Sequence, residues 1–118
     1  MLQIYNMSND DADDLIFKAL SHRVRRRILD HLKTQSLTTG ALCAAFPELD
    51  RCTIMQHLGV LEDAGLIVAE KRGRERWNHL DALPIHAIHE RWIGPYAAYA
   101  RNMLGRLQRE LRDDTTSR

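Results

Sequence analysis

A cysteine, a methionine and a histidine fall within six positions of one segment, RCTIMQHLGVLED at residues 51–63. Thiolate, thioether and imidazole groups are soft or borderline metal ligands, so Cys52, Met55 and His57 suggest a metal or redox site. Three such groups bind one ion only if their side chains converge. The chemistry available to them therefore depends on the element that carries them.

The apolar residues of this segment recur at helical spacing. At 100° per residue, Ile54, Leu58 and Leu61 share one face, which is typical of a helix packed on a core. Asp50 precedes the segment as an N-cap residue, and Gly65 follows it as a residue that commonly ends helices. We therefore expect a helix over about 51–64. In that helix His57 points well away from Cys52, which argues against a shared ligand cluster.

The outward side of this helix carries groups that can bind nucleic acid. Gln56 can bond adenine bidentately, Arg51 can reach guanine or phosphate, and Thr53 can bond either kind of acceptor. Cys52 and Met55 can pack on thymine methyl groups. His57 lies nearer the core and is expected to brace the helix or to touch phosphate. The candidate DNA-binding residues of this segment are Arg51, Cys52, Thr53, Met55, Gln56 and His57.

A basic hairpin is expected directly after this helix. Residues 66–80, LIVAEKRGRERWNHL, alternate in polarity on both sides of a turn at Arg72-Gly73-Arg74. Arg72, Arg74 and Arg76 lie at or beside the turn, and alternate residues of a strand project to one side. Three guanidinium groups at a loop tip could enter a minor groove or bind phosphates. We therefore include these three arginines among the candidate DNA-binding residues.

The segments before residue 51 predict three helices and a short strand. We expect a first helix over about 10–20 capped by Asn9 or Asp10, and a second over about 22–34 capped by Ser21. A stub strand at 36–39 and a third helix at about 40–46, capped by Thr38 or Thr39, follow. A short helix, a turn, a capped helix and a basic hairpin together predict a winged helix-turn-helix fold, mainly α with a small β-hairpin.

The segments after residue 80 predict two further helices. Leu83-Pro84 is expected to start one of them, since proline is favoured at the first helical position. Gly94-Pro95 is expected to break or kink it, and a last helix is expected from about 96 to 112. The whole chain, residues 1–118, is interpreted as a single domain.

Composition restricts the classes of protein that are possible. The chain has 118 residues, 44% apolar and 28% charged, which is ordinary for a globular protein. It has no run of about 18 apolar residues and no basic, apolar start typical of a signal peptide, so a cytoplasmic chain without membrane contact is expected. Residues 21–79 carry ten Lys or Arg against seven acids, so an anionic partner would dock there. Glycine-rich phosphate loops and the common catalytic motifs are absent, so neither an enzyme nor a cofactor is expected.

Several motifs together resemble those of the ArsR-type winged-helix repressors. These are FKALSHRVRRRILDHL, LTTGALCAAF, TIMQHLGVLEDAGLI and EKRGRERWNHLD, within residues 15–81, and WIGPYAAYARNMLGRLQREL, which resembles a branch without metal-binding motifs. The resemblance implies a homodimer paired through helices at 9–20 and 83–112. It further implies a helix-turn-helix at 38–64, a wing at 66–80 and a pseudo-palindromic DNA operator. A repressor of this family is usually released from its operator by an inducer. The resemblance therefore implies an inducer, for which a small molecule is the candidate.

Other functions remain possible on the sequence alone. The thiolate site of the family needs Cys-x-Cys, but Ala45 stands two residues after Cys43. His86 and His89 lie on one helical face and could bind zinc, although two neighbouring ligands are a weak signal. Cys52, near a helix N-terminus, could act as a redox switch. A winged helix used for protein contact, without DNA binding, is the alternative from another functional class.

Overall fold

The larger, N-terminal part of the chain folds into short capped helices around a small sheet. The computed structural model describes residues 8–116, and its contacts divide the chain after Ile85 into two compact units. The first unit contains α2 (Asn9–Leu20), α3 (Arg23–Leu32), α4 (Thr39–Ala45) and α5 (Arg51–Asp63), with strands β1 (Leu37–Thr38), β2 (Ile67–Arg72) and β3 (Glu75–Leu80). The predicted fold class, mainly α with a small hairpin, is confirmed, and the stub strand at 37–38 extends the hairpin into a three-stranded sheet.

Each helix of this unit starts at a polar side chain that accepts a backbone N–H. Asp50 caps α5 as the sequence predicted, and Thr38, one of the two residues expected there, caps α4. The predicted caps of the first two helices were wrong. Ser8 caps α2 in place of Asn9 or Asp10, and His22 caps α3 in place of Ser21. The Ser21 hydroxyl instead donates to the Lys18 carbonyl at 2.7 Å and so closes the end of α2.

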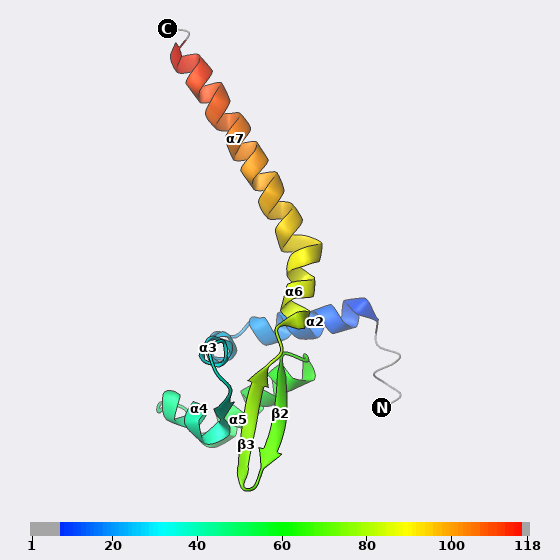
Figure 1. The fold of residues 1–118 in the computed structure, drawn as a ribbon, viewed down its shortest axis with the longest axis vertical. Helices are drawn as coiled ribbons and strands as arrows, with labels where there is room; N and C mark the ends of the chain where they lie inside the picture. Colours follow the sequence, from blue (N-terminus) through cyan, green and yellow to red (C-terminus); the bar gives the residue numbers. More distant parts are fainter. Residues whose placement is uncertain (1–7, 117–118) are drawn as a thin grey trace. The chain divides into compact units, whose positions relative to one another are not determined.

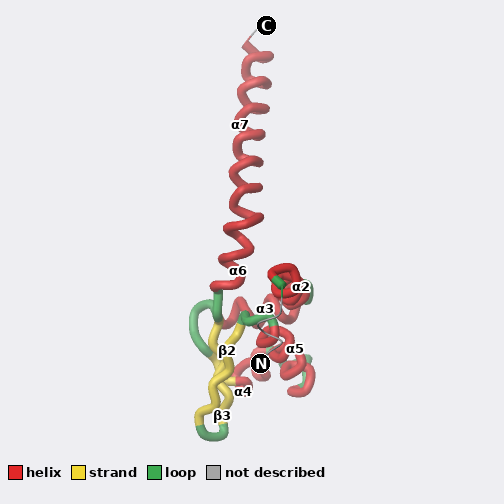
Figure 2. The backbone as a smooth tube through the Cα atoms, turned by 90° about the vertical axis from the view of Figure 1, so that its right-hand side faces the viewer, coloured by secondary structure: helices red, strands yellow, loops and turns green. Residues whose placement is uncertain are grey.

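The sheet has the strand order β1-β3-β2 and is antiparallel throughout. A two-residue turn, Gly73-Arg74, joins β2 to β3, since Arg72 pairs with Glu75. Gly73 has φ +62°, and no non-glycine residue among those described has positive φ, so the turn has the type II′ pattern that needs glycine at its first central position. The hairpin extends beyond the helices of its unit (Figures 1 and 2).

The helices cover one face of the sheet and enclose an aliphatic core. Figure 2 shows α2, α3 and α5 on one side of the hairpin. Ile67 and Asn78 face this side and are buried, whereas Val68 on the other side is 54% exposed. The Asn78 amide donates to the Leu37 carbonyl and to the Thr39 hydroxyl, each at 3.2 Å, and so joins β3 to β1 and to the start of α4. The core side chains, all at most 6% exposed, include Ile16, Ile28, Leu29, Leu32, Leu42, Phe46, Ile54, Leu58, Leu61, Leu66 and Ile67.

Helical backbone continues through the second unit. α6 (Leu83–Ile88) leads into a π-helical turn, η1 (His89–Ile93), and then into α7 (Gly94–Thr116). The sequence predicted a break or a kink at Gly94-Pro95 and a last helix from about residue 96. Helical backbone is not broken there, but the α-helix is interrupted by the π-helical turn directly before Gly94, and α7 starts two residues before the predicted start. Pro95 cannot donate a backbone hydrogen bond, and Gly94 donates to the carbonyl five residues earlier, at His89, so a wider turn accommodates the proline. A Cβ atom at Gly94 would lie 3.2 Å from that carbonyl oxygen, which favours glycine there.

Helix α7 exposes a long apolar stripe. It has 23 residues, or about 35 Å of helix at 1.5 Å per residue. Six large apolar side chains on it are more than 40% exposed, namely Tyr96, Tyr99, Met103, Leu104, Leu107 and Leu111. No helix within residues 8–116 has the length and apolar character needed to cross a membrane.

Candidate nucleic-acid interface

Helix α5 is held by its cap and by its buried face. The Asp50 carboxylate accepts the Thr53 backbone N–H at 2.7 Å, and this hydrogen bonding lowers the pKa of Asp50 below its ordinary value. Ile54, Leu58 and Leu61 are fully buried. Both the start of the helix and its rotation about its own axis are therefore set by contacts with the rest of the unit.

The face of α5 opposite this core is open. We call it the reading face and define it as Arg51, Cys52, Thr53, Met55 and Gln56. Arg51, Cys52 and Gln56 are exposed, and Thr53 and Met55 are half-buried beside them. The rotation predicted from the sequence is thus the rotation observed. Cys52, Met55 and His57 do not converge, because the His57 ring lies against Arg25 and His22 while Cys52 is exposed on the reading face.

His57 turns from the reading face toward the start of α3. Its Nδ1 lies 3.1 Å from Nη1 of Arg25, and its ring centroid lies 4.5 Å from that of His22. Because a guanidinium only donates, Nδ1 must accept, which requires a neutral ring. Burial, followed by the charges of His22 and Arg25, lowers the pKa of His57. Arg25 also donates to the carbonyls of Ala19 and Lys18, so His57 braces α5 against the α2–α3 junction.

This arrangement predicts how stability responds to acid. The folded state lowers the pKa of His57 below 6.5, its ordinary value, so the unfolded chain binds the proton more readily. The stability that neutral His57 contributes is therefore fully present above pH 6.5 and is lost as the pH falls below 6.5 and through the lowered pKa of the folded state. In His57→Gln the side-chain oxygen can still accept from Arg25 but does not titrate.

Urea unfolding at pH 7.5 and pH 5.5 tests this expectation. The wild-type protein should lose more of its free energy of unfolding between the two pH values than His57→Gln does. Equal losses in the two proteins would show that protonation of His57 does not couple to folding.

The three arginines of the hairpin do not form one cluster. Arg76 pairs with Lys71 on the face of the sheet toward α5, and Arg72 pairs with Glu75 on the opposite face. Arg72 forms an ion pair with Glu70, which lowers the Glu70 pKa, and its guanidinium lies 5.2 Å from the centroid of the Trp77 ring. Arg74, in the turn, is exposed. The expectation of three guanidinium groups together at the tip was wrong, because a two-residue turn places Arg72 and Arg76 out of register by one position.

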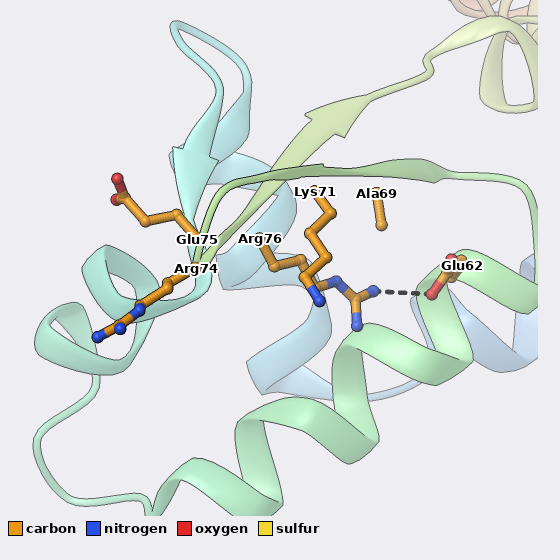
Figure 3. A pocket seen from close by; sticks show the side chains of 6 residues that line it. All are labelled: Glu62, Ala69, Lys71, Arg74, Glu75 and Arg76. Carbon is orange, nitrogen blue, oxygen red and sulfur yellow. Dashed lines mark hydrogen bonds and ion pairs between the residues drawn. The ribbon is translucent and has the colours of Figure 1, made fainter.

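A cleft lies between the hairpin and the second half of α5. We call it the basic cleft, and Figure 3 shows the Arg76 side chain crossing it toward Glu62, where Nη2 lies 2.7 Å from Oε2. Lys71 projects into the same space, whereas Arg74 points away along the turn. The residues that line the cleft are Glu62, Ala69, Lys71, Arg74, Glu75 and Arg76. Sequence reasoning missed Lys71 and Glu62, and the cross-strand register that places Lys71 beside Arg76 is the signal that would have identified Lys71.

A second hollow connects the hairpin to the start of the reading face. Arg51, Arg74 and Arg76 line it together with Thr38–Gly40, at the start of α4. Basic side chains of the hairpin therefore lie beside the N-terminal end of α5. Flexible cations next to an exposed polar helix face can contact a phosphate backbone while the helix contacts base edges.

The residues considered for metal or redox chemistry are divided between the two units. Cys43 is half-buried on α4, and Cys52 is an exposed free thiol on the reading face. His86 lies 3.7 Å from Glu90 one helical turn later, in the second unit. His89 lies on the same helical path, at the start of the π-helical turn.

Comparisons with known proteins give relatives over most of the chain. A helix-turn-helix domain model matches residues 20–69. YuzN of Bacillus subtilis (strain 168), an uncharacterized HTH-type transcriptional regulator, is 35% identical over 86 residues, which are 68% of this chain and 94% of that protein. The transcriptional repressor SdpR of the same organism is 36% identical over 59 residues, 50% of this chain and 64% of SdpR.

Solved structures share the fold. The crystal structure of an ArsR family transcriptional regulator has a TM-score of 0.70 and 28% identity, and the match covers 80% of this chain and 95% of that one. The structure of Rv0081 from Mycobacterium tuberculosis has a TM-score of 0.55 and 27% identity over 80% of this chain and 86% of that one.

Proposed function

This chain belongs to the ArsR-type winged helix-turn-helix transcriptional regulators, a family of regulators and not of enzymes, and we propose that it is a homodimeric repressor of a pseudo-palindromic DNA operator. The observation that supports this most is the exposed reading face of α5 with basic hairpin residues beside it. In helix-turn-helix proteins the second helix enters the major groove, and its N-terminal residues contact base edges. The wing, defined as β2, β3 and their turn, then contacts the flanking backbone.

On α5, sequence recognition rests on the exposed polar side chains. Gln56 is the residue suited to bidentate bonding of adenine, and Arg51 the one suited to guanine or to a nearby phosphate. Thr53 adds a hydroxyl, while Cys52 and Met55 supply apolar contact to thymine methyl groups. His57, held by Arg25, positions the helix and lies at the edge of this contact.

On the wing, binding rests on charge. Arg74 is exposed in the turn and has the best access to phosphates. Lys71 in the basic cleft and Arg72 on the outer face add positive charge on either side of it. Arg76 was included with them from the sequence, and its ion pair with Glu62 distinguishes it from Arg74.

These assignments predict that substitutions on α5 and on the wing weaken DNA binding in two different ways. Gln56→Ala should weaken binding by roughly 1–3 kcal/mol and relax the preference at one base position, because a base-edge contact is lost. Arg74→Ala should weaken binding to all sequences alike and make it less salt-dependent, because a phosphate contact is lost.

A mobility-shift series with DNA from upstream of the gene, at several salt concentrations, measures both effects. Gln35→Ala and Arg27→Ala, exposed residues near and on α3, are the matched controls and should bind as wild type does. Wild-type binding that neither Gln56→Ala nor Arg74→Ala weakens would contradict the assigned surface. No binding by the wild-type protein would instead favour a winged helix used for protein contact.

The apolar stripe of α7 supports the homodimer. A soluble chain rarely leaves six large apolar side chains exposed along one helix, and a second copy of the same helix can cover them. The helix at Asn9–Leu20 is proposed to join this interface. A dimer presents two reading faces, which matches a pseudo-palindromic operator. Release by a small-molecule inducer and a cytoplasmic location complete the proposal.

A further inference from the structure

The ion pair between Arg76 and Glu62 joins two elements that must meet DNA together. Glu62 lies in the last turn of α5, and Arg76 lies on β3, one residue after the Arg72–Glu75 pair that closes the turn. The pair joins Nη2 and Oε2 at 2.7 Å, a distance typical of a charge-assisted hydrogen bond. It therefore connects α5 directly to the part of the wing nearest its turn (Figure 3).

The base of the wing already has its own attachment. The Gly65 N–H donates to the Glu62 carbonyl at 2.9 Å, and the Leu66 N–H donates to the Leu61 carbonyl at 3.0 Å, so α5 leads into β2 through a tight connection. These bonds hold the hairpin at residues 65–67. The side chains nearest the turn, Lys71 and Arg74, lie four to seven residues further along the chain. The ion pair is thus a second attachment, on the side of the turn.

Arg76 is also poorly placed to bind a phosphate. Its side chain is only 26% exposed, and its Nη2 is taken by Glu62. Arg74, by contrast, is exposed in the turn, and its side chain is directed away from Glu62 (Figure 3). The two arginines therefore differ in role although they are two positions apart in sequence.

We propose that Arg76 is a positioning residue, which with Glu62 sets the distance and angle between the reading face and the wing. The inference rests on the proposed DNA-binding function and deepens it. The pair fixes the wing before DNA binds. It holds Arg74 at the position from which this side chain contacts a phosphate once Gln56 contacts a base edge. Without the pair, the wing samples other angles, and that freedom must be lost when DNA binds.

The direction in which Glu62→Gln changes the affinity for DNA distinguishes this role from a phosphate contact. Removing an acid beside DNA ordinarily tightens binding, because the phosphates no longer face a negative charge. If Arg76 were a phosphate ligand restrained by Glu62, Glu62→Gln would free it and tighten binding further. If the pair positions the wing, Glu62→Gln weakens binding, and Arg76→Gln weakens it by a similar factor.

A double-mutant cycle on the full chain measures this with duplex DNA from upstream of the gene. We expect Glu62→Gln and Arg76→Gln each to raise Kd about two- to five-fold, the range of an exposed ion pair, and the double variant to be no weaker than either single one. Glu62→Arg with Arg76→Glu restores the pair with reversed polarity and should recover most of the affinity. Asp63→Asn, the acid next to Glu62, is the matched control and should bind as well as wild type or better.

Affinities are compared well below the melting temperature of every variant, so that unfolding does not contribute. Tighter binding by Glu62→Gln, additive losses in the double variant, or no effect of either single change would each overturn the positioning role while leaving DNA binding intact. Absence of binding by wild type would overturn the proposed function itself.

Discussion

A protein with Leu104→Asp and Leu107→Asp should be monomeric and should bind operator DNA at least about 100-fold more weakly than wild type. Both leucines are more than half exposed on α7 in the single chain. Fully burying an exposed leucine side chain contributes roughly 1.5–3 kcal/mol. Since each of these leucines is about half exposed in the single chain, four of them in a symmetric pair of helices contribute roughly 3–6 kcal/mol to association. Four carboxylates in the same interface would instead be buried without partners. Loss of the dimer separates the two half-site contacts, and each reading face then binds alone.

Sedimentation equilibrium and the mobility shift together measure this effect. Because the two leucines are exposed in the single chain, the monomer should keep its helical circular dichroism. Asn102→Asp adds one negative charge per chain, half that of the double leucine variant, on the opposite side of α7, and that variant should remain dimeric and bind DNA as wild type does. A double leucine variant that sediments as a dimer would show that α7 is not the main dimer contact.

Leu58→Ala should lower the free energy of unfolding by about 2–5 kcal/mol, the largest stability effect expected in the DNA-binding unit. Leu58 is fully buried on α5, which contacts α2, α3, α4 and β2. Truncation removes buried apolar surface and leaves a cavity that these surrounding elements can only partly fill. Since a small domain has about 5–15 kcal/mol of stability in total, a large part of the margin would be lost.

A substitution at the neighbouring residue, Gly59, is expected to change stability in the opposite direction. Gly59 lies within α5, and a Cβ atom there would meet nothing within 4 Å. Gly59→Ala should therefore raise the free energy of unfolding by about 1 kcal/mol, since alanine favours helix and restricts the unfolded chain. Urea unfolding of the three proteins at one protein concentration gives both values, because the stability of the proposed dimer would depend on concentration. A stability loss in Gly59→Ala as large as that in Leu58→Ala would show that helix rotation is misassigned.

The sequence by itself determined the elements whose causes are local. Helical periodicity placed Ile54, Leu58 and Leu61 inward, and so assigned the reading face before any contact was known. Thr38 and Asp50 as caps and Gly73 in the turn follow from backbone groups within three residues of each side chain. The family motifs overlap the same segments, which is why fold class and family were predicted together.

Only the tertiary structure decided which side chains meet across elements. That His57 accepts from Arg25, 32 positions earlier, depends on how α5 packs on the α2–α3 junction. That Arg76 faces Glu62 while Arg72 faces Trp77 depends on the exact length of the turn, because a change of one residue moves a strand side chain to the other face of the sheet. Periodicity gives the direction of a side chain relative to its own element, whereas its partner depends on how distant elements pack. The distinction between a charge that binds DNA and a charge that positions the wing therefore lies in the packing alone.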